Sequence, residues 1–323
     1  MPDNKFSSSE PTTKDDIKPA KASKDSAAPV APSSPNPPPA EAPTAVLLKN
    51  LITPKGRGMG YKPDTHDKSK DPSVRALLGA PMRLASAASI ENFMKGIYNQ
   101  LQTSSCTGWA FAQAIMLRIA VLGLNIPLPS PEAIYVFGRA IARQQAGQDA
   151  TTPLTDSGAQ PSLIVQGINQ WGAPSSAAWP FDPNTINDEP NFAELEAAAA
   201  FLIQSCNRIS STGAGRLQDV RHALASGYPV IIGTAVDEAF ENYMGGTNKK
   251  TGLPNVVTAP DPSKVLGGHM MHLVGYNANA MFRGVNQWGT SWGDRGLYWA
   301  DESFITTDLM TDIYVLACNA SGR

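Results

Sequence analysis

The sequence predicts an α+β protein with a helical lobe, a β-sheet lobe and a cleft between them. Segments with a helical period lie within residues 106–227, and segments rich in β-branched and aromatic residues lie within residues 228–317. Helices and strands that are separated along the chain in this way are typical of α+β proteins. Ligands often bind in a cleft between two such parts.

Composition separates a polar leader from a folded body. The chain has 323 residues, of which 42% are hydrophobic, enough for one large domain or two small ones. Residues 1–44 are rich in Pro, Ser, Ala and Lys, and we expect them to be disordered because they cannot bury enough apolar surface to offset the entropy of ordering. Residues 45–90 are predicted to be an approach segment, and residues 91–320 to form the folded domain.

Charge and hydropathy exclude several classes of partner. Residues 1–96 carry a net charge of +4 and residues 97–323 a net charge of −6, too little positive charge to indicate a nucleic-acid partner. The N-terminus lacks the apolar region of a signal peptide, and the most apolar run, residues 110–124, is short for a bilayer. We therefore expect no membrane partner, and either a cytoplasmic location or export by a specialised system.

Five segments are predicted to be helical. Residues 106–124 are apolar with few interruptions, as in a buried central helix. A second helix begins with Ser130 as its N-cap and Pro131 in its first turn, and extends to about residue 145. The same periodicity predicts helices over residues 163–171, 191–208 and 217–227.

Five later segments are predicted to be strands, because they are β-branched and aromatic and are separated by Gly or Asn turns. They are YPVIIGTAV, HMMHLVGYN, FRGVNQW, GLYWA and DIYVLA. Alternation along the second segment places His269 on one face and His272 on the other, within an apolar stripe. His272 is therefore predicted to be a core histidine whose hydrogen bonds are satisfied.

The stretch QLQTSSCTGWAF can be aligned with a cysteine nucleophile in two registers. Counting back from Trp109 places Gly108 where the thiol would stand, whereas counting from the cysteine present places the nucleophile at Cys106. A thiol at a helix start is favoured as the anion by unpaired N–H groups and the helix dipole. Without such context, Cys106 would be a small buried apolar residue.

Two later residues supply the partners that a thiol nucleophile requires. His269 follows two glycines at the start of a strand, as a base entering a cleft would. Asn286 lies in GVNQWGTSWGDRG and offers an amide that can orient the imidazole, while Trp288 could shield that contact from water. The three cysteines are too few and too widely spaced to indicate a disulfide framework or a zinc site, so no metal is expected.

The order of these motifs resembles the papain-like cysteine peptidases. It consists of the cysteine segment, then GHMMHLVGY, then NQWGTSWGDRG, and the resemblance covers residues 58–318. The match is nearest to a bacterial branch in which Asn-Gln precedes Ser-Cys-Thr, here Asn99 and Gln100 before Cys106. The resemblance implies a papain-like two-lobe fold, with a central cysteine helix in one lobe and an antiparallel sheet or barrel in the other. Residues 91–320 would be its catalytic domain.

The resemblance also implies roles for individual residues. Cys106 would be the nucleophile, His269 its base and Asn286 the group that orients the imidazole, with Trp288 as a structural neighbour. Gln100 and the backbone N–H of Cys106 would form the oxyanion hole. Substrate would bind through Gly158, Ala159 and Gly268, where Ala159 can serve because the pairing uses backbone groups. The implied reaction is hydrolysis of a polypeptide through a thioester, without any cofactor.

Other interpretations remain open at this stage. A papain-like protein without thiol reactivity would bind extended peptides, and a transamidase or deamidase on the same scaffold would also acylate Cys106. The leader could be a signal read by secretion or targeting machinery. It could also act as an inhibitory propeptide, but residues 1–90 contain no helical prodomain pattern, so inhibition is not expected.

Overall fold

The computed structural model describes residues 50–79, 83–193, 199–201 and 203–318, all within the unit Glu41–Arg323. The predicted leader, residues 1–44, lies outside the described residues. So does the beginning of the predicted approach segment. No helix within the described ranges is both long and apolar enough to cross a membrane.

The centre of the fold is an antiparallel sheet in the order β4-β9-β5-β6-β7-β8, with β1 paired to β6. Its predicted strands are all present. The strands are β1 (Ala88–Ser89), β4 (Ile203–Arg208), β5 (Val230–Asp237), β6 (Val265–Tyr276), β7 (Phe282–Val285), β8 (Leu297–Ala300) and β9 (Met310–Cys318). A small second sheet pairs β2 (Ala173–Pro174) with β3 (Ala199–Phe201).

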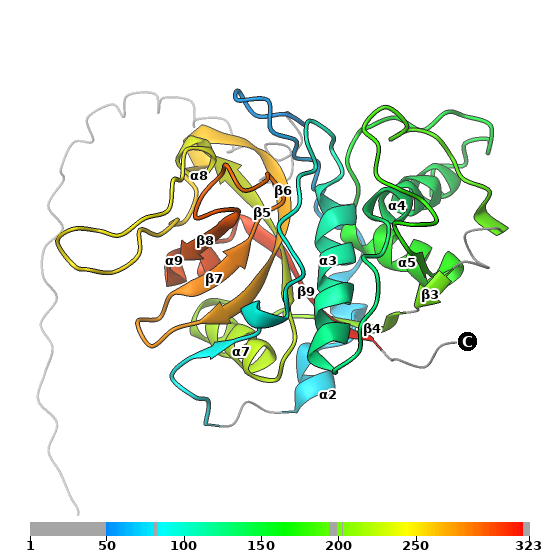
Figure 1. The fold of residues 1–323 in the computed structure, drawn as a ribbon. Helices are drawn as coiled ribbons and strands as arrows, with labels where there is room; N and C mark the ends of the chain where they lie inside the picture. The colour runs from blue at the N-terminus through cyan, green and yellow to red at the C-terminus, as the bar shows by residue number, and fades with distance from the viewer. Residues whose placement is uncertain (1–49, 80–82, 194–198, 202, 319–323) are drawn as a thin grey trace, which may run out of the picture. The chain divides into compact units, whose positions relative to one another are not determined.

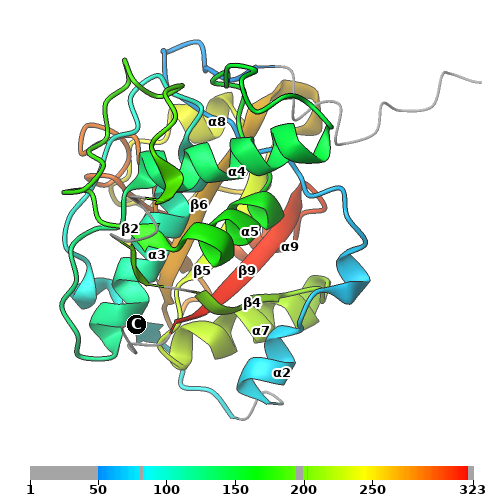
Figure 2. The same ribbon diagram turned by 90° about the vertical axis from the view of Figure 1, so that its right-hand side faces the viewer.

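Helices pack on both faces of this sheet. On one side lie α3 (Cys106–Val121), α4 (Pro131–Gln145) and α5 (Pro161–Trp171), with α3 against β6, β9 and β5 (Figures 1 and 2). On the other side α7 (Gly213–Ala225) contacts β6 and α9 (Glu302–Thr306). The shorter helices are α2 (Val74–Leu78), α8 (Glu238–Glu241) and three 3-10 turns at Lys68–Lys70, Glu91–Phe93 and Pro262–Lys264. The predicted α+β class is confirmed.

Strand alternation places the two largest core clusters on opposite faces of the sheet. Ile231 and Met270 face α3 and pack with its apolar side chains, whereas Met271 and Leu273 face α7. Because α3 lies between the sheet and α4, nearly all of its residues are buried. This explains the apolar character that predicted a central helix, and it fixes the first residue of α3 against β6.

The helix predicted over residues 191–208 is wrong in its C-terminal part, which the structure describes. Residues 191–208 were expected to be helical, but residues 203–208 form β4, which pairs antiparallel with β9 from Cys318 to Tyr314. A vacant sheet edge at β9 offers this segment backbone partners, and such tertiary pairing overrides a modest helical preference. Residues 194–198 and 202 lie outside the described residues.

Candidate active site

Cys106 is the first residue of α3 and is fully buried. The alternative register is disfavoured by packing, because a Cβ atom at Gly108 would lie 2.2 Å from the carbonyl oxygen of Pro131 and 2.8 Å from Cβ of Tyr135. Gly108 therefore faces α4 at close range, where a cysteine side chain would not fit. The packing favours Cys106 as the residue that corresponds to the nucleophile.

His269 and Asn286 meet as the sequence predicted. Nε2 of His269 lies 2.8 Å from Oδ1 of Asn286, and the indole ring of Trp288 stacks on the imidazole with centroids 4.6 Å apart. Because an amide oxygen only accepts, Nε2 carries the proton and Nδ1 keeps its lone pair. Nδ1 is buried and has no hydrogen-bond partner within the described residues. This nitrogen is available as a base.

The loop before α3 holds Gln100 beneath the cleft. Its backbone N–H donates to the carbonyl of Gln287 at 2.9 Å, and its side chain is fully buried. Nε2 of Gln100 donates to the carbonyls of Thr103 at 2.8 Å and Met59 at 3.4 Å. The amide nitrogen of Gln100 is therefore engaged by two backbone carbonyls.

Gln287 was not predicted as a site residue, yet it joins the two elements that carry the site. Its Nε2 donates to the carbonyls of Cys106 at 3.3 Å and Met270 at 2.5 Å, and its backbone N–H donates to Oδ1 of Asn286 at 2.8 Å. The side chain thus links the start of α3 to β6. Its only signal in the sequence is a large amide next to Asn286.

Residues 58–62, called the cleft segment below, occupy the predicted substrate-binding positions. Gly60 and Tyr61 each donate a backbone N–H to the carbonyl of Gly268 at 3.1 Å. Ala159 donates to the carbonyl of Gly60 at 2.9 Å and accepts from Lys62 at 3.1 Å. All of these contacts are made by backbone groups.

The glycines of this region permit very close backbone contact. A Cβ atom at Gly158, whose φ is +82°, would lie 2.2 Å from the carbonyl oxygen of Gly60. A Cβ atom at Gly60 would in turn lie 2.1 Å from the carbonyl oxygen of Ser104, in the loop before Cys106. The cleft segment therefore fits between the strip and this loop only because glycine stands at both positions.

The cleft segment is anchored beyond the glycines by Tyr61. Its ring is buried in the same cluster as Cys106, and its hydroxyl contacts Oγ1 of Thr311 at 2.5 Å and donates to the carboxylate of Asp312. Tyr61 runs parallel to Ala159 in their bridge. The sequence did not predict that Tyr61 would anchor a segment in the cleft. Inhibition was judged there only from the absence of a helical prodomain pattern.

Burial sets the protonation state of the pair. Loss of solvent raises the pKa of Cys106 to about 12, while backbone N–H groups of Met270, Thr107 and Tyr61 act in the opposite direction. Loss of solvent also lowers the pKa of His269 to about 4, opposed by the hydrogen bond to Asn286. With the cleft segment in place, the thiol and the imidazole are therefore both neutral at pH 7.

His272 lies in the core, as predicted, but its hydrogen bonding differs from the prediction. The side chain is 1% exposed, and its Nδ1 has no hydrogen-bond partner within the described residues. Across the same parts of the chain, no group of three or more His, Cys, Asp or Glu side chains could hold a metal ion. The side chains described at the site are a thiol, an imidazole and the three amides of Gln100, Asn286 and Gln287.

Comparison with known proteins finds a matching family model. The family model described as "Papain family cysteine protease" matches residues 163–311, which include His269 and Asn286. The fold and this match identify the class: the chain has a papain-like fold, and its residues 163–311 match the model of the papain-family cysteine proteases. The predicted resemblance to the papain-like cysteine peptidases is thereby confirmed.

Individual relatives come from a virus, a bacterium and a protozoan. An uncharacterised peptidase C1-like protein of Acanthamoeba polyphaga mimivirus is 29% identical over 219 residues, which are 66% of this chain and 66% of the viral protein. Xylellain, a cysteine protease from Xylella fastidiosa, has a similar fold, with a TM-score of 0.62 and 23% identity over 83% of this chain and 98% of that chain. A procathepsin B from Trypanosoma congolense gives a TM-score of 0.59 and 15% identity, covering 86% and 88% of the two chains.

Proposed function

We propose that the protein hydrolyses peptide bonds through a Cys106-His269-Asn286 triad, and that the cleft segment keeps this activity latent. The observation that carries the proposal is the state of His269. Its Nε2 is fixed by Asn286, while its Nδ1 is buried without a partner within the described residues. An imidazole held in this way has one nitrogen committed to orientation and the other free to accept a proton.

The reaction follows from these groups once the cleft is open. Nδ1 of His269 takes the proton of the Cys106 thiol, and the thiolate attacks the carbonyl carbon of a peptide. The oxyanion accepts hydrogen bonds from the Gln100 amide and the Cys106 backbone N–H. The imidazolium then protonates the leaving amine, and water hydrolyses the thioester to free the acid and the thiol.

Occupancy of the strip supports latency. A polypeptide substrate would need the backbone groups of Gly268 and Ala159 that now bind Gly60 and Lys62. The carbonyl of Met59 already faces the Gln100 amide. Displacement of the cleft segment would also readmit water, which would lower the pKa of Cys106 and raise that of His269 toward their ordinary values.

The test uses the full chain with Gly60→Val, which adds side-chain atoms where a Cβ already meets the Ser104 carbonyl. Gly96→Val is the matched control, since nothing lies within 4 Å of that position. We expect Gly60→Val to hydrolyse a denatured protein substrate and Cys106→Ser in the same background not to. Product masses decide the alternatives: addition of water indicates hydrolysis, joining to an added amine indicates transamidation, and no product from a folded protein contradicts the proposal.

The proposal also concerns the cellular location of the protein and the recognition of its leader by export machinery. A cytoplasmic location, or export by machinery that reads the leader, would both be compatible with a latent peptidase. A chain whose cleft is closed can be stored or transported without cleaving its surroundings. Release of the cleft segment would then be the event that starts proteolysis.

A further inference from the structure

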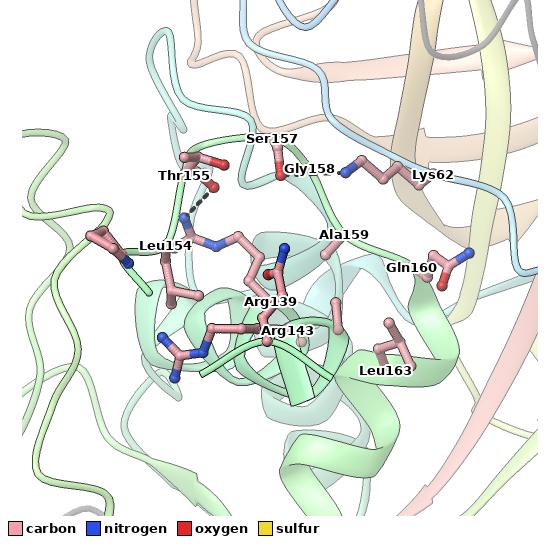
Figure 3. A pocket seen from close by; sticks show the side chains of 14 residues that line it. Lys62, Arg139, Arg143, Leu154, Thr155, Ser157, Gly158, Ala159, Gln160 and Leu163 are labelled. Atoms are coloured by element: carbon pink, nitrogen blue, oxygen red, sulfur yellow. Dashed lines mark hydrogen bonds between the residues drawn. The ribbon is translucent and has the colours of Figure 1, made fainter. Parts of the chain in front are cut away.

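A pocket of about 330 Å³ lies beside the cleft segment, between the substrate strip and α4 (Figure 3). Lys62 enters it from the cleft segment, Arg139 and Arg143 enter from α4, and Ser157 and Gly158 form the strip side. Three cationic side chains thus line one pocket. No step of the proposed peptidase reaction uses any of them.

Among the described residues, two of the three cations have no acidic partner in an ion pair. Arg143 is balanced, because it pairs with both carboxylate oxygens of Glu189 at 2.5 and 2.8 Å. Lys62 donates only to Oγ of Ser157, at 3.3 Å, and forms no ion pair within the described residues. Arg139 is 4% exposed, and its bonds run to neutral groups that include the Thr155 carbonyl and Oδ1 of Asn187, both at 2.8 Å.

Burial lowers the pKa of Arg139, and the charges of Asp156, Glu132 and Glu189 oppose that shift, although none of these acids forms an ion pair with Arg139 within the described residues. All three accept hydrogen bonds from other groups. Asp156 accepts from the Ser104 backbone N–H and the Tyr135 hydroxyl. Glu132 accepts from the indole of Trp179 and from other donors on the same loop. Burial lowers the pKa of Lys62, and the charge of Arg139 lowers it further, as expected for two cations that share a pocket.

Unused donors remain in the pocket. A lysine has three N–H donors and an arginine five. One donor of Lys62 is engaged by Ser157, and the described contacts of Arg139 run from Nε, from Nη1 twice and from Nη2 once. Within the part of the chain that the structure describes, two donors of Lys62 and one of Arg139 thus have no acceptor. An anionic acceptor would also reduce the repulsion between the two cations.

We propose that this pocket binds a small oxyanion, a carboxylate or a phosphate, between Lys62 and Arg139. Because Lys62 belongs to the cleft segment and Arg139 to α4, the bound anion links the segment to this helix. The anion therefore stabilises the closed cleft. This regulatory consequence rests on the proposed function, whereas binding itself does not.

Binding is measured first, in the full-length Cys106→Ala protein, so that no catalysis is needed. Isothermal titration with sodium phosphate and with sodium succinate is compared with sodium chloride at equal ionic strength. We expect saturable binding of phosphate or succinate, weakened about tenfold by Lys62→Gln, since a charge-assisted bond is lost. Lys95→Gln removes the same charge from an exposed side chain and should leave binding unchanged.

The titrations also separate the ligand sources. Preference for phosphate indicates a tetrahedral anion, and preference for succinate indicates a carboxylate. Either result supports the site if Lys62→Gln weakens it. Equal heats from chloride, or equal affinity in wild type and Lys62→Gln, would overturn the proposal.

Regulation is measured with wild type as the rate at which an epoxide thiol probe labels Cys106. At an anion concentration ten times its Kd, labelling should slow about elevenfold, because only the closed state binds the anion. The Lys62→Gln protein, whose Kd is about tenfold higher, should slow only about twofold at the same anion concentration. If binding is present but labelling does not change, the link to the cleft is wrong; if a folded Gly60→Val protein is never labelled, the proposed function fails instead.

Discussion

The backbone N–H of Gly60 donates a hydrogen bond of 3.1 Å to the carbonyl oxygen of Gly268, the residue immediately before His269. The cleft segment therefore contacts β6, the strand that carries His269. The same glycine would clash with the Ser104 carbonyl if it had a Cβ atom. The cleft segment thus contacts both sides of the predicted triad, and its removal should change the chemistry of the thiol.

Thiol reactivity in wild type should follow the raised pKa of Cys106. With a pKa of about 12, the thiolate fraction at pH 7 is very small and rises about tenfold per pH unit. Alkylation of Cys106 by iodoacetamide, followed by peptide mass mapping, should therefore accelerate about a hundredfold between pH 7 and 9.

The Gly60→Val variant should increase the rate at which Cys106 is alkylated. Overpacking costs about 1–3 kcal/mol, which would increase the open population by about five- to 150-fold. Alkylation at pH 7 should rise accordingly, while Gly96→Val should match wild type. Equal alkylation rates in wild type and a folded Gly60→Val would show that the cleft segment does not protect the thiol.

Gln100 should act on the chemical step. Removal of one oxyanion donor costs about 10²–10³ in kcat, so Gln100→Ala in the Gly60→Val background should lose that much. Gln102→Ala is the matched control, because Gln102 is exposed and stands six residues before Gly108, as Gln100 does before Cys106. Steady-state kinetics on a peptide substrate would check this, and a larger loss from Gln102→Ala would favour the other register.

Two buried histidines should make the fold sensitive to acid. The pKa values of His269 and His272 are both lowered to about 4 by burial, whereas in the unfolded chain each imidazole takes up a proton near pH 6.5. Between these values the unfolded state binds more protons, so the free energy of unfolding falls as pH falls. Each histidine contributes up to ~1.4 kcal/mol per pH unit.

Urea unfolding between about pH 6.5 and 5 measures this slope before most carboxylates titrate. His272→Leu should reduce the part of the slope due to the two histidines by about half. The pKa of Asp64 is raised by burial and by Asp312, which acts in the opposite sense at lower pH. An unfolding free energy that does not change from pH 6.5 to 5 would contradict the neutral buried state of both rings.

The sequence predicted the elements with strong local signals. Ser130 and Pro131 marked the start of α4, which begins at Pro131, and the alternation around His269 placed Met270 and Met271 on opposite faces of β6. The pairing of His269 with Asn286 could also be predicted, since strand and motif order bring them together. These features depend on neighbours in sequence or on the known order of one family's motifs.

Other features depended on contacts distant in sequence. Residues 203–208 form a strand because they pair with the edge of β9. The sequence of this segment alone does not indicate that pairing. The cleft segment was predicted only as part of an approach segment, because its partners are distant in sequence. Ala159 lies about a hundred residues after Gly60, and Gly268 about two hundred. Gly58 and Gly60 were the available signal, since alternate glycines permit a backbone to approach another closely.

The most direct test of the triad is the intact mass of the protein after treatment with an epoxide probe for papain-like thiols at pH 7. Wild type, Gly60→Val, and Gly60→Val combined with Cys106→Ala or with His269→Ala would be compared, each shown to be folded by circular dichroism. The account predicts one adduct that forms rapidly on Gly60→Val, slowly on wild type and on neither double variant. A folded Gly60→Val protein without an adduct, or one whose labelling survives His269→Ala unchanged, would contradict an activated Cys106–His269 pair.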